Sequence, residues 1–178
     1  FTKNKYIRPL EYFQDCVGYF SKRQMIDFYY AKLDTDQYLR QTQEQLNKYQ
    51  ALSNQLNQQI INKAKQKPES LIKKKINIDK YLAQYQNQLV TATTLLRNYP
   101  EGVIISAILL VKQEKNVTVL IDGNNDDFRK FNAKHLLIWQ IIQMYQKQGF
   151  ATLNLGGISN VTVDTDKYTG LNEFKLGF

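Results

Sequence analysis

The sequence predicts an α/β (α+β) fold that is interrupted by a long helical insertion. Three observations lead to this prediction. Short runs rich in β-branched and aromatic residues occur near both ends of the chain and read as strands. Residues 35–98 contain no glycine and place apolar residues at heptad spacing. A longer amphipathic segment after residue 122 reads as a helix between strands, which is typical of a mixed sheet-and-helix domain.

The first 34 residues are predicted to form a helix followed by a strand. Pro9 suits the first turn of a helix, because its missing N–H would have no helical partner there. An apolar stripe follows at helical spacing: Leu10, Phe13, Val17 and Phe20. The lone cysteine, Cys16, is expected to be a small buried residue. Met25–Ala31 is dense in aromatic residues and is predicted to be a largely buried strand.

Residues 35–98 are predicted to form two antiparallel helices. The first seam carries Leu39, Leu46, Tyr49, Leu56 and Ile60, with polar Thr42 and Ser53 at the remaining positions. The second seam carries Leu71, Ile78, Leu82, Tyr85, Leu89, Ala92 and Leu96. The two helices are expected to meet at 65–70, where Pro68 and Glu69 suit the first turn of the second helix. This pattern indicates a coiled-coil arm that is inserted into a globular base.

From Tyr99 the chain is expected to return to the base. Residues 103–111 and 117–121 are predicted to form a strand hairpin. Asp122–Asn125 supplies capping residues for a long helix that is stopped at Gly149. The helix is predicted to run through Phe128, Phe131, Leu136, Trp139, Ile142 and Tyr145, and Trp139 is expected to contribute to the core. A further strand is predicted at 151–155.

Composition limits the classes of function. No apolar run is long enough to cross a bilayer, and one cysteine cannot form an internal disulfide, which is consistent with a reducing cytoplasm. His135 is the single histidine and has no neighbouring cysteine or histidine, so a metal site there is not expected. The formal net charge is +8, which makes a polyanionic partner a reasonable hypothesis.

Much of the excess positive charge is concentrated where the two predicted arm helices meet. The lysines are Lys63, Lys65, Lys67, Lys73, Lys74 and Lys75, and they face the single acid Glu69. Two interpretations remain open. The lysines can simply be solvated charges at the end of a coiled coil. Alternatively, they can contact a phosphate backbone, which would give affinity with little sequence readout.

The carboxy-terminal stretch combines two glycines with a lysine in an apolar context. Gly156-Gly157-Ile158-Ser159 follows a predicted strand, and paired glycines at such a place indicate a tight turn or a close backbone approach. Gly170-Leu171-Asn172-Glu173-Phe174-Lys175-Leu176-Gly177-Phe178 ends the chain and sets Lys175 between Phe174 and Leu176. From these residues alone, Lys175 would be a solvated lysine on an alternating strand.

This ending resembles the GGIS…GLxEFKxGF motif of the Fem family of non-ribosomal peptidyl transferases (FemA, FemB, FemX and MurM-like proteins). The resemblance implies the second of two acetyltransferase-like (GNAT) subdomains, formed by residues 1–34 and 99–178, with an inserted antiparallel two-helix coiled-coil arm at 35–98. It also implies a cytoplasmic enzyme that moves an amino acid from aminoacyl-tRNA to the stem-peptide amine of a peptidoglycan precursor. Aminoacyl-tRNA is the co-substrate, and no other cofactor is expected.

The resemblance assigns residues as well. Lys175 would be catalytic, and Phe174, Gly156 and Gly157 would bind substrate. Arg8 and Tyr12 match an Arg-x-x-x-Tyr pattern that helps to hold the muramyl-pentapeptide, since arginine suits bidentate phosphate contact. The six lysines of the arm would bind tRNA.

The same resemblance sets expectations for partners. The acceptor would be UDP-linked or lipid-linked muramyl-pentapeptide, and a peripheral contact with the inner face of the membrane stays open. The arm favours a FemA-like protein over FemX-like proteins, which are expected to lack it. The chain is expected to be the carboxy-terminal portion of a longer enzyme and to be inactive alone, because the amino-terminal subdomain that forms the other wall of the cleft is absent.

Two other functions compete with this one. An acetyl-CoA N-acetyltransferase would share the fold, but it needs a glycine-rich pyrophosphate loop, and Gly123-Asn124-Asn125-Asp126-Asp127 carries two carboxylates at that junction. A non-catalytic coiled-coil interaction module would account for the arm. It would not account for the two carboxy-terminal motifs.

Overall fold

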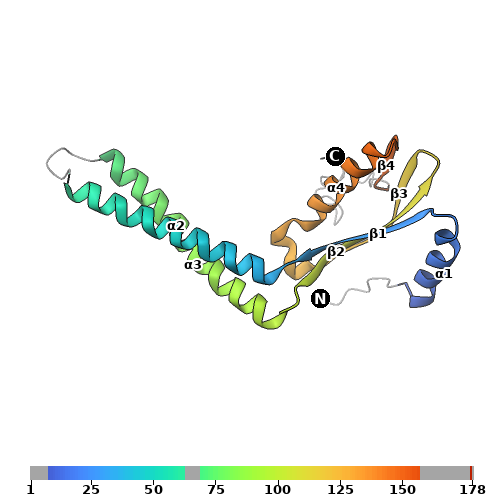
Figure 1. The fold of residues 1–178 in the computed structure, drawn as a ribbon, viewed down its shortest axis with the longest axis horizontal. Coiled ribbons are helices and arrows are strands. Elements are labelled where there is room, and N and C mark those ends of the chain that lie inside the picture. The colour runs from blue at the N-terminus through green and yellow to red at the C-terminus, as the bar shows by residue number, and fades with distance from the viewer. Residues whose placement is uncertain (1–7, 63–68, 157–176, 178) are drawn as a thin grey trace, which may run out of the picture. The chain divides into compact units, whose positions relative to one another are not determined.

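A computed structural model describes residues 8–62, 69–156 and 177 of the protein. The chain divides into two compact units, one made of Phe1–Ala31 with Ile105–Phe178 and the other of Lys32–Ile104. The first unit holds most of a mixed sheet and three helices, and the second holds a pair of long helices (Figure 1). None of the described helices is long and apolar enough to cross a membrane.

The described strands form one sheet in the order β1-β2-β3-β4. Their bounds are β1 Ile26–Leu33, β2 Val103–Gln113, β3 Asn116–Asn124 and β4 Thr152–Asn154. β2 and β3 form the predicted antiparallel hairpin, and β4 lies parallel to β3. Leu109 faces Ile121 and Leu110 faces Val119, so Leu120 is an extra residue that forms a bulge in β3.

Helix α4, Ala133–Lys147, covers one face of the sheet. Its Leu137, Ile138 and Ile141 pack with Ile108 and Leu110 of β2 to form the main hydrophobic core. Because strand side chains alternate between faces, Ala107 and Leu109 point to the opposite face. Helix α1, Leu10–Ser21, lies over that opposite face.

Two predictions about the long helix were wrong. The segment after β3 is first a 3₁₀ helix, η2 Asp126–Phe131, and α4 begins only after Asn132, whose φ of 50° breaks the helical path. Trp139, which was expected in the core, is 51% exposed, and its helix neighbour Leu136 is 59% exposed. Apolar residues occur all round this helix, so their spacing does not select the buried face. The predicted stop is confirmed, because Gly149 adopts a φ of 84° just beyond the helix.

The prediction of a largely buried strand at Met25–Ala31 was also wrong in part. Phe28 and Tyr30 are 59% and 52% exposed, because they lie on the face that α4 does not cover. The stripe on α1 is likewise incompletely buried: Leu10 is 67% exposed, and Cys16 is only partly buried.

The second unit contains helices α2, Thr35–Asn62, and α3, Glu69–Asn98, as predicted. They run antiparallel and pack along their length, with Tyr49 stacked between Tyr81 and Tyr85 at ring-centroid distances of 5.3 Å. The polar seam residues are satisfied. Thr42 bonds to the Tyr38 carbonyl, and Ser53 Oγ donates to Asp79 Oδ1 at 2.7 Å.

Candidate functional site

The predicted pair at the start of α1 is brought together. The guanidinium carbon of Arg8 lies 4.5 Å from the centroid of the Tyr12 ring, so the two side chains meet. Arg8 itself lies just before α1, which begins at Leu10. Tyr12 also meets Phe13 edge to face at 5.6 Å. A hydrogen bond with Cys16, followed by partial burial, raises the pKa of Tyr12, against the opposing effect of Arg8. Tyr12 therefore stays neutral at physiological pH and can donate a hydrogen bond.

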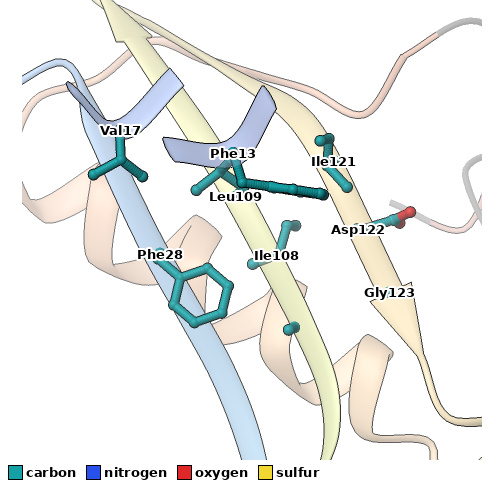
Figure 2. Close-up of a pocket in the computed structure, with 9 residues that line it drawn as sticks. Phe13, Val17, Phe28, Ile108, Leu109, Ile121, Asp122 and Gly123 are labelled. Atoms are coloured by element: carbon teal, nitrogen blue, oxygen red, sulfur yellow. The ribbon is translucent and has the colours of Figure 1, made fainter. Parts of the chain in front are cut away.

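An apolar cavity of about 470 Å³ lies between α1 and the sheet face that α4 leaves uncovered (Figure 2). Its volume is within the range of small-molecule sites. Side chains from four elements surround it, and its lining residues are Phe13, Val17, Phe28, Ala107, Ile108, Leu109, Ile121, Asp122 and Gly123. Tyr12 is adjacent in sequence to Phe13, so α1 carries both Tyr12 and part of the cavity lining.

Asp122 is the one ionisable residue among the described residues that line the cavity. Its carboxylate forms an ion pair with Lys134, the second residue of α4. The pairing offsets the charge of the carboxylate, and the remaining lining is apolar. The cavity can therefore hold an uncharged, apolar group, whereas it offers no cation for a phosphate.

A polar cluster on the other face of the sheet was not predicted. Lys112 Nζ lies 2.9 Å from Asp27 Oδ2, and the hydroxyl of Tyr145 donates to the same carboxylate oxygen. Burial is the main cause that raises the pKa of Tyr145, and the bond to Asp27 adds to it, so the hydroxyl stays protonated. The sequence signal that could have predicted this cluster was a charged residue, Asp27 or Lys112, within each of two largely apolar strands. The cluster is satisfied internally and joins β1, β2 and α4.

The carboxy-terminal motif is described only at its start and at Gly177. Gly156 has a φ of 83°, a conformation that favours glycine, and this supports the predicted turn. Its N–H donates to Asn154 Oδ1 at 2.8 Å, so that donor is already used within the chain. The predicted site residues Gly157, Phe174 and Lys175 lie outside the described residues.

The predicted tRNA-binding lysines fall into two groups. Lys63, Lys65 and Lys67 lie outside the described residues. On α3, Lys73 and Lys74 are exposed, whereas Lys75 lies at the helix seam and forms an ion pair with Asp79. The hydrogen bonds from Lys75 and Ser53 lower the pKa of Asp79. Of the three described lysines, Lys73 and Lys74 are the better placed to meet an external phosphate.

Two features of the described residues bear on the binding of a metal ion and of coenzyme A. Among residues 8–62, 69–156 and 177, no three His, Cys, Asp or Glu side chains lie where they could hold a metal ion, and His135 is exposed. At the junction after β3, Asn125 caps the short helix η2, and Asp126 and Asp127 occupy its first turn. Two carboxylates at this position oppose the binding of a diphosphate.

The pattern of the FemAB family matches residues 3–178. This chain belongs to the FemAB family. The match runs through the sheet, the helix pair and the carboxy-terminal motif, so the predicted family resemblance is confirmed.

Curated relatives of this FemAB chain include proteins named Lipid II:glycine glycyltransferase. The one from Staphylococcus haemolyticus is 23% identical over 169 residues, which are 94% of this chain and 39% of the relative. The one from Staphylococcus aureus is 22% identical over 175 residues, or 94% of this chain and 40% of the relative. A shorter match, 30% identical over 103 residues, links it to the protein of Staphylococcus saprophyticus. The chain thus spans about two fifths of the first two relatives.

The crystal structure of FemX shares the fold, with a TM-score of 0.71 and 20% sequence identity over 94% of this chain and 42% of that one. Coverage this high includes most of the helix pair. The expectation that the arm separates FemA-like from FemX-like proteins was therefore wrong, because a FemX chain aligns with nearly the whole of this one.

Proposed function

We propose that this FemAB chain is the carboxy-terminal part of a cytoplasmic aminoacyltransferase that adds an amino acid from aminoacyl-tRNA to the stem-peptide amine of a peptidoglycan precursor. The observation that carries the proposal is the family match over residues 3–178. Relatives named Lipid II:glycine glycyltransferase favour glycine as the amino acid and a lipid-linked acceptor over a UDP-linked one. The proposal keeps the GNAT-like base and the coiled-coil arm as separate domains.

The proposed reaction joins an activated ester to an amine. The amine nitrogen attacks the ester carbonyl, a tetrahedral oxyanion forms, and the ribose hydroxyl of the tRNA leaves with the proton that the amine gives up. Alignment of the two substrates and stabilisation of the oxyanion are the main requirements, so no covalent nucleophile and no further cofactor are proposed. Lys175 is proposed as the cation that stabilises this oxyanion or a precursor phosphate.

Arg8, Tyr12 and the cavity are proposed to bind the acceptor. Arg8 supplies a cation with planar donor geometry, and Tyr12 supports the guanidinium by stacking at 4.5 Å. The cavity beneath the same helix would take an apolar, uncharged part of the acceptor such as a stem-peptide side chain. The charged part of the substrate would then contact Arg8, just before α1, and the apolar part would enter the cavity under α1.

The exposed lysines of the arm are proposed to contact the phosphate backbone of tRNA. Replacing Lys73 and Lys74 with glutamine should weaken tRNA binding and reduce its salt dependence, because fewer counterions are released. Lys75→Gln is the matched comparison and should have less effect, since Asp79 already engages that lysine. If the affinity for tRNA and its dependence on salt are unchanged in the Lys73/Lys74 variant, these lysines are only solvated surface charges of the arm.

The alternatives are an acetyl-CoA-dependent N-acyltransferase and a non-catalytic coiled-coil module. The carboxylates of Asp126 and Asp127 at the start of η2 disfavour the first. The deciding experiment uses the longest native polypeptide that carries this chain, with lipid-linked precursor as acceptor and either glycyl-tRNA or acetyl-CoA as donor. We expect transfer from glycyl-tRNA alone. Transfer from acetyl-CoA alone would support the first alternative, and transfer from neither donor would support the second.

A further inference from the structure

Three isoleucines are exposed near the end of the helix pair where α2 ends and α3 begins. Ile61 is 72% exposed, Ile72 is 43% exposed and Ile76 is 50% exposed. Ile72 and Ile76 are four residues apart on α3 and are therefore neighbours on its surface. Isolated exposed aliphatic residues are common, but three at one end of a hairpin call for an explanation.

The three side chains lie on one side of the hairpin. Each directly follows a partly buried seam residue: Ile61 follows Ile60, Ile72 follows Leu71, and Ile76 follows Lys75. One position along a helix is a rotation of about 100° from the seam. In two antiparallel helices, the two-fold relation places the residue after the seam on the same side of both helices. The isoleucines thus form one apolar strip, here called the isoleucine strip.

The described surroundings of the isoleucine strip are mostly basic or uncharged. Residues 50–62 of α2 contain no charged residue. On α3, Lys73 directly follows Ile72, and Lys80 lies four residues after Ile76. Both lysines are exposed, and their aliphatic stems can lie along apolar surface while their ammonium groups reach the solvent. The carboxylate of Asp79 is held by Lys75 and Ser53, which leaves Glu69 as the other acid of this segment.

We propose that the isoleucine strip contacts an anionic lipid bilayer. Aliphatic side chains flanked by lysines are typical of helices that lie at a membrane interface, with the isoleucines in the acyl boundary and the lysines at the phosphates. A nucleic acid would engage the lysines but would leave the exposed isoleucines unexplained.

The membrane proposal rests on the proposed function in one respect: a lipid-linked acceptor would bring the enzyme to a bilayer surface. The test does not depend on it. Co-sedimentation with vesicles measures binding without any transfer reaction, so a failure of transfer and a failure of membrane contact are read separately.

The experiment compares the longest native polypeptide that carries this chain with its Ile72→Gln/Ile76→Gln variant. Glutamine is a good helix former, so the helix should be retained, and circular dichroism checks this. Vesicles contain either phosphatidylcholine alone or phosphatidylcholine with phosphatidylglycerol. We expect binding to the anionic vesicles that falls about tenfold or more in the double variant. Lys80→Gln should weaken binding to the anionic vesicles only.

Val90→Gln is the matched control. Val90 is 69% exposed and lies 14 residues beyond Ile76, on the same side of α3 but about 21 Å further along the helix. The Val90→Gln variant should bind vesicles as well as the unmodified protein does. Vesicle binding that is absent or is unaffected by the isoleucine substitutions overturns the proposal. A loss of tRNA binding, or of a concentration-dependent dimer, in the isoleucine variant without a loss of vesicle binding would assign the strip to RNA or to a second copy instead.

Discussion

The hydroxyl of Tyr145 donates a hydrogen bond to the carboxylate of Asp27, a residue 118 positions earlier in the chain. Asp27 also pairs with Lys112 at 2.9 Å, so one carboxylate joins α4, β1 and β2. Tyr145 is 3% exposed and belongs to the main hydrophobic core. A hydrogen bond to a charged group in such a place contributes more to stability than a surface bond.

Tyr145→Phe should destabilise the protein by about 1–2 kcal/mol, because it removes the hydroxyl and retains the ring. The measurement is chemical denaturation followed by tyrosine and tryptophan fluorescence. Tyr81→Phe is the control, since Tyr81 is 48% exposed and packs through its ring, and it should change stability by less than about 0.5 kcal/mol. Equal stabilities for the two variants would show that the Asp27 contact contributes nothing.

The Lys75–Asp79 pair should make the stability of the helix hairpin depend on pH. The hydrogen bonds from Lys75 and Ser53 lower the pKa of Asp79 from its usual 3.8, so the unfolded chain binds the proton more readily than the folded one. The stabilisation is therefore complete above about pH 5 and is lost as the pH falls through the folded-state pKa. Asp79→Asn should remove this acid-dependent part of the helical melting curve. The effect should be small, because the carboxylate is 40% exposed.

Gly102→Ala should destabilise the second unit by about 2 kcal/mol or more. Gly102 has a φ of 78°, and an added Cβ would lie 2.6 Å from the Leu33 carbonyl oxygen. Gly18→Ala is the matched comparison. A Cβ there meets nothing within 4 Å, and alanine favours the helix, so Gly18→Ala should stabilise the protein by about 0.5–1 kcal/mol. Thermal unfolding by circular dichroism measures both. A neutral Gly102→Ala variant would contradict the described turn.

Val17→Phe should partly fill the cavity under α1. Val17 lines the cavity and is 47% exposed, so a larger side chain there can be accommodated without disturbing the main core. If the cavity holds part of the acceptor, KM for the acceptor should rise by roughly tenfold while KM for the tRNA donor stays unchanged. Leu10→Phe, on the same helix but outside the cavity lining, should leave both constants unchanged. An unaltered acceptor KM in the Val17 variant would remove the cavity from the proposed site.

Lys175→Met should leave folding intact and lower transfer by roughly a hundredfold, as expected for the loss of one group that stabilises an oxyanion. A fall in kcat would indicate that Lys175 acts in the transition state, and an increase in KM alone would indicate binding of a precursor phosphate. Arg8→Ala should act mainly on KM, because its proposed partner does not react. Full activity of Lys175→Met would exclude Lys175 from the site.

The local pattern of the sequence determined the helix pair, the β2–β3 hairpin and the ends of the helices. Heptad spacing over 35–62 and 69–98 repeats for many turns, and the seam residues it selects are the less exposed ones in the structure. The stop at Gly149 and the turn at Gly156 follow from backbone conformations that glycine adopts without strain. The family was recognisable from the last residues, although most of them lie outside the described part of the chain.

Only the tertiary structure decided which surfaces are covered. Leu136, Leu137, Ile138 and Trp139 are consecutive and apolar, so any side of α4 could have faced the sheet, and the packing chose Leu137 and Ile138. The exposure of Phe28 follows from the sheet having α4 on one face and an open cavity on the other. The bond between Asp27 and Tyr145 depends on the order of the strands, because residues so far apart in sequence meet only when the sheet is assembled.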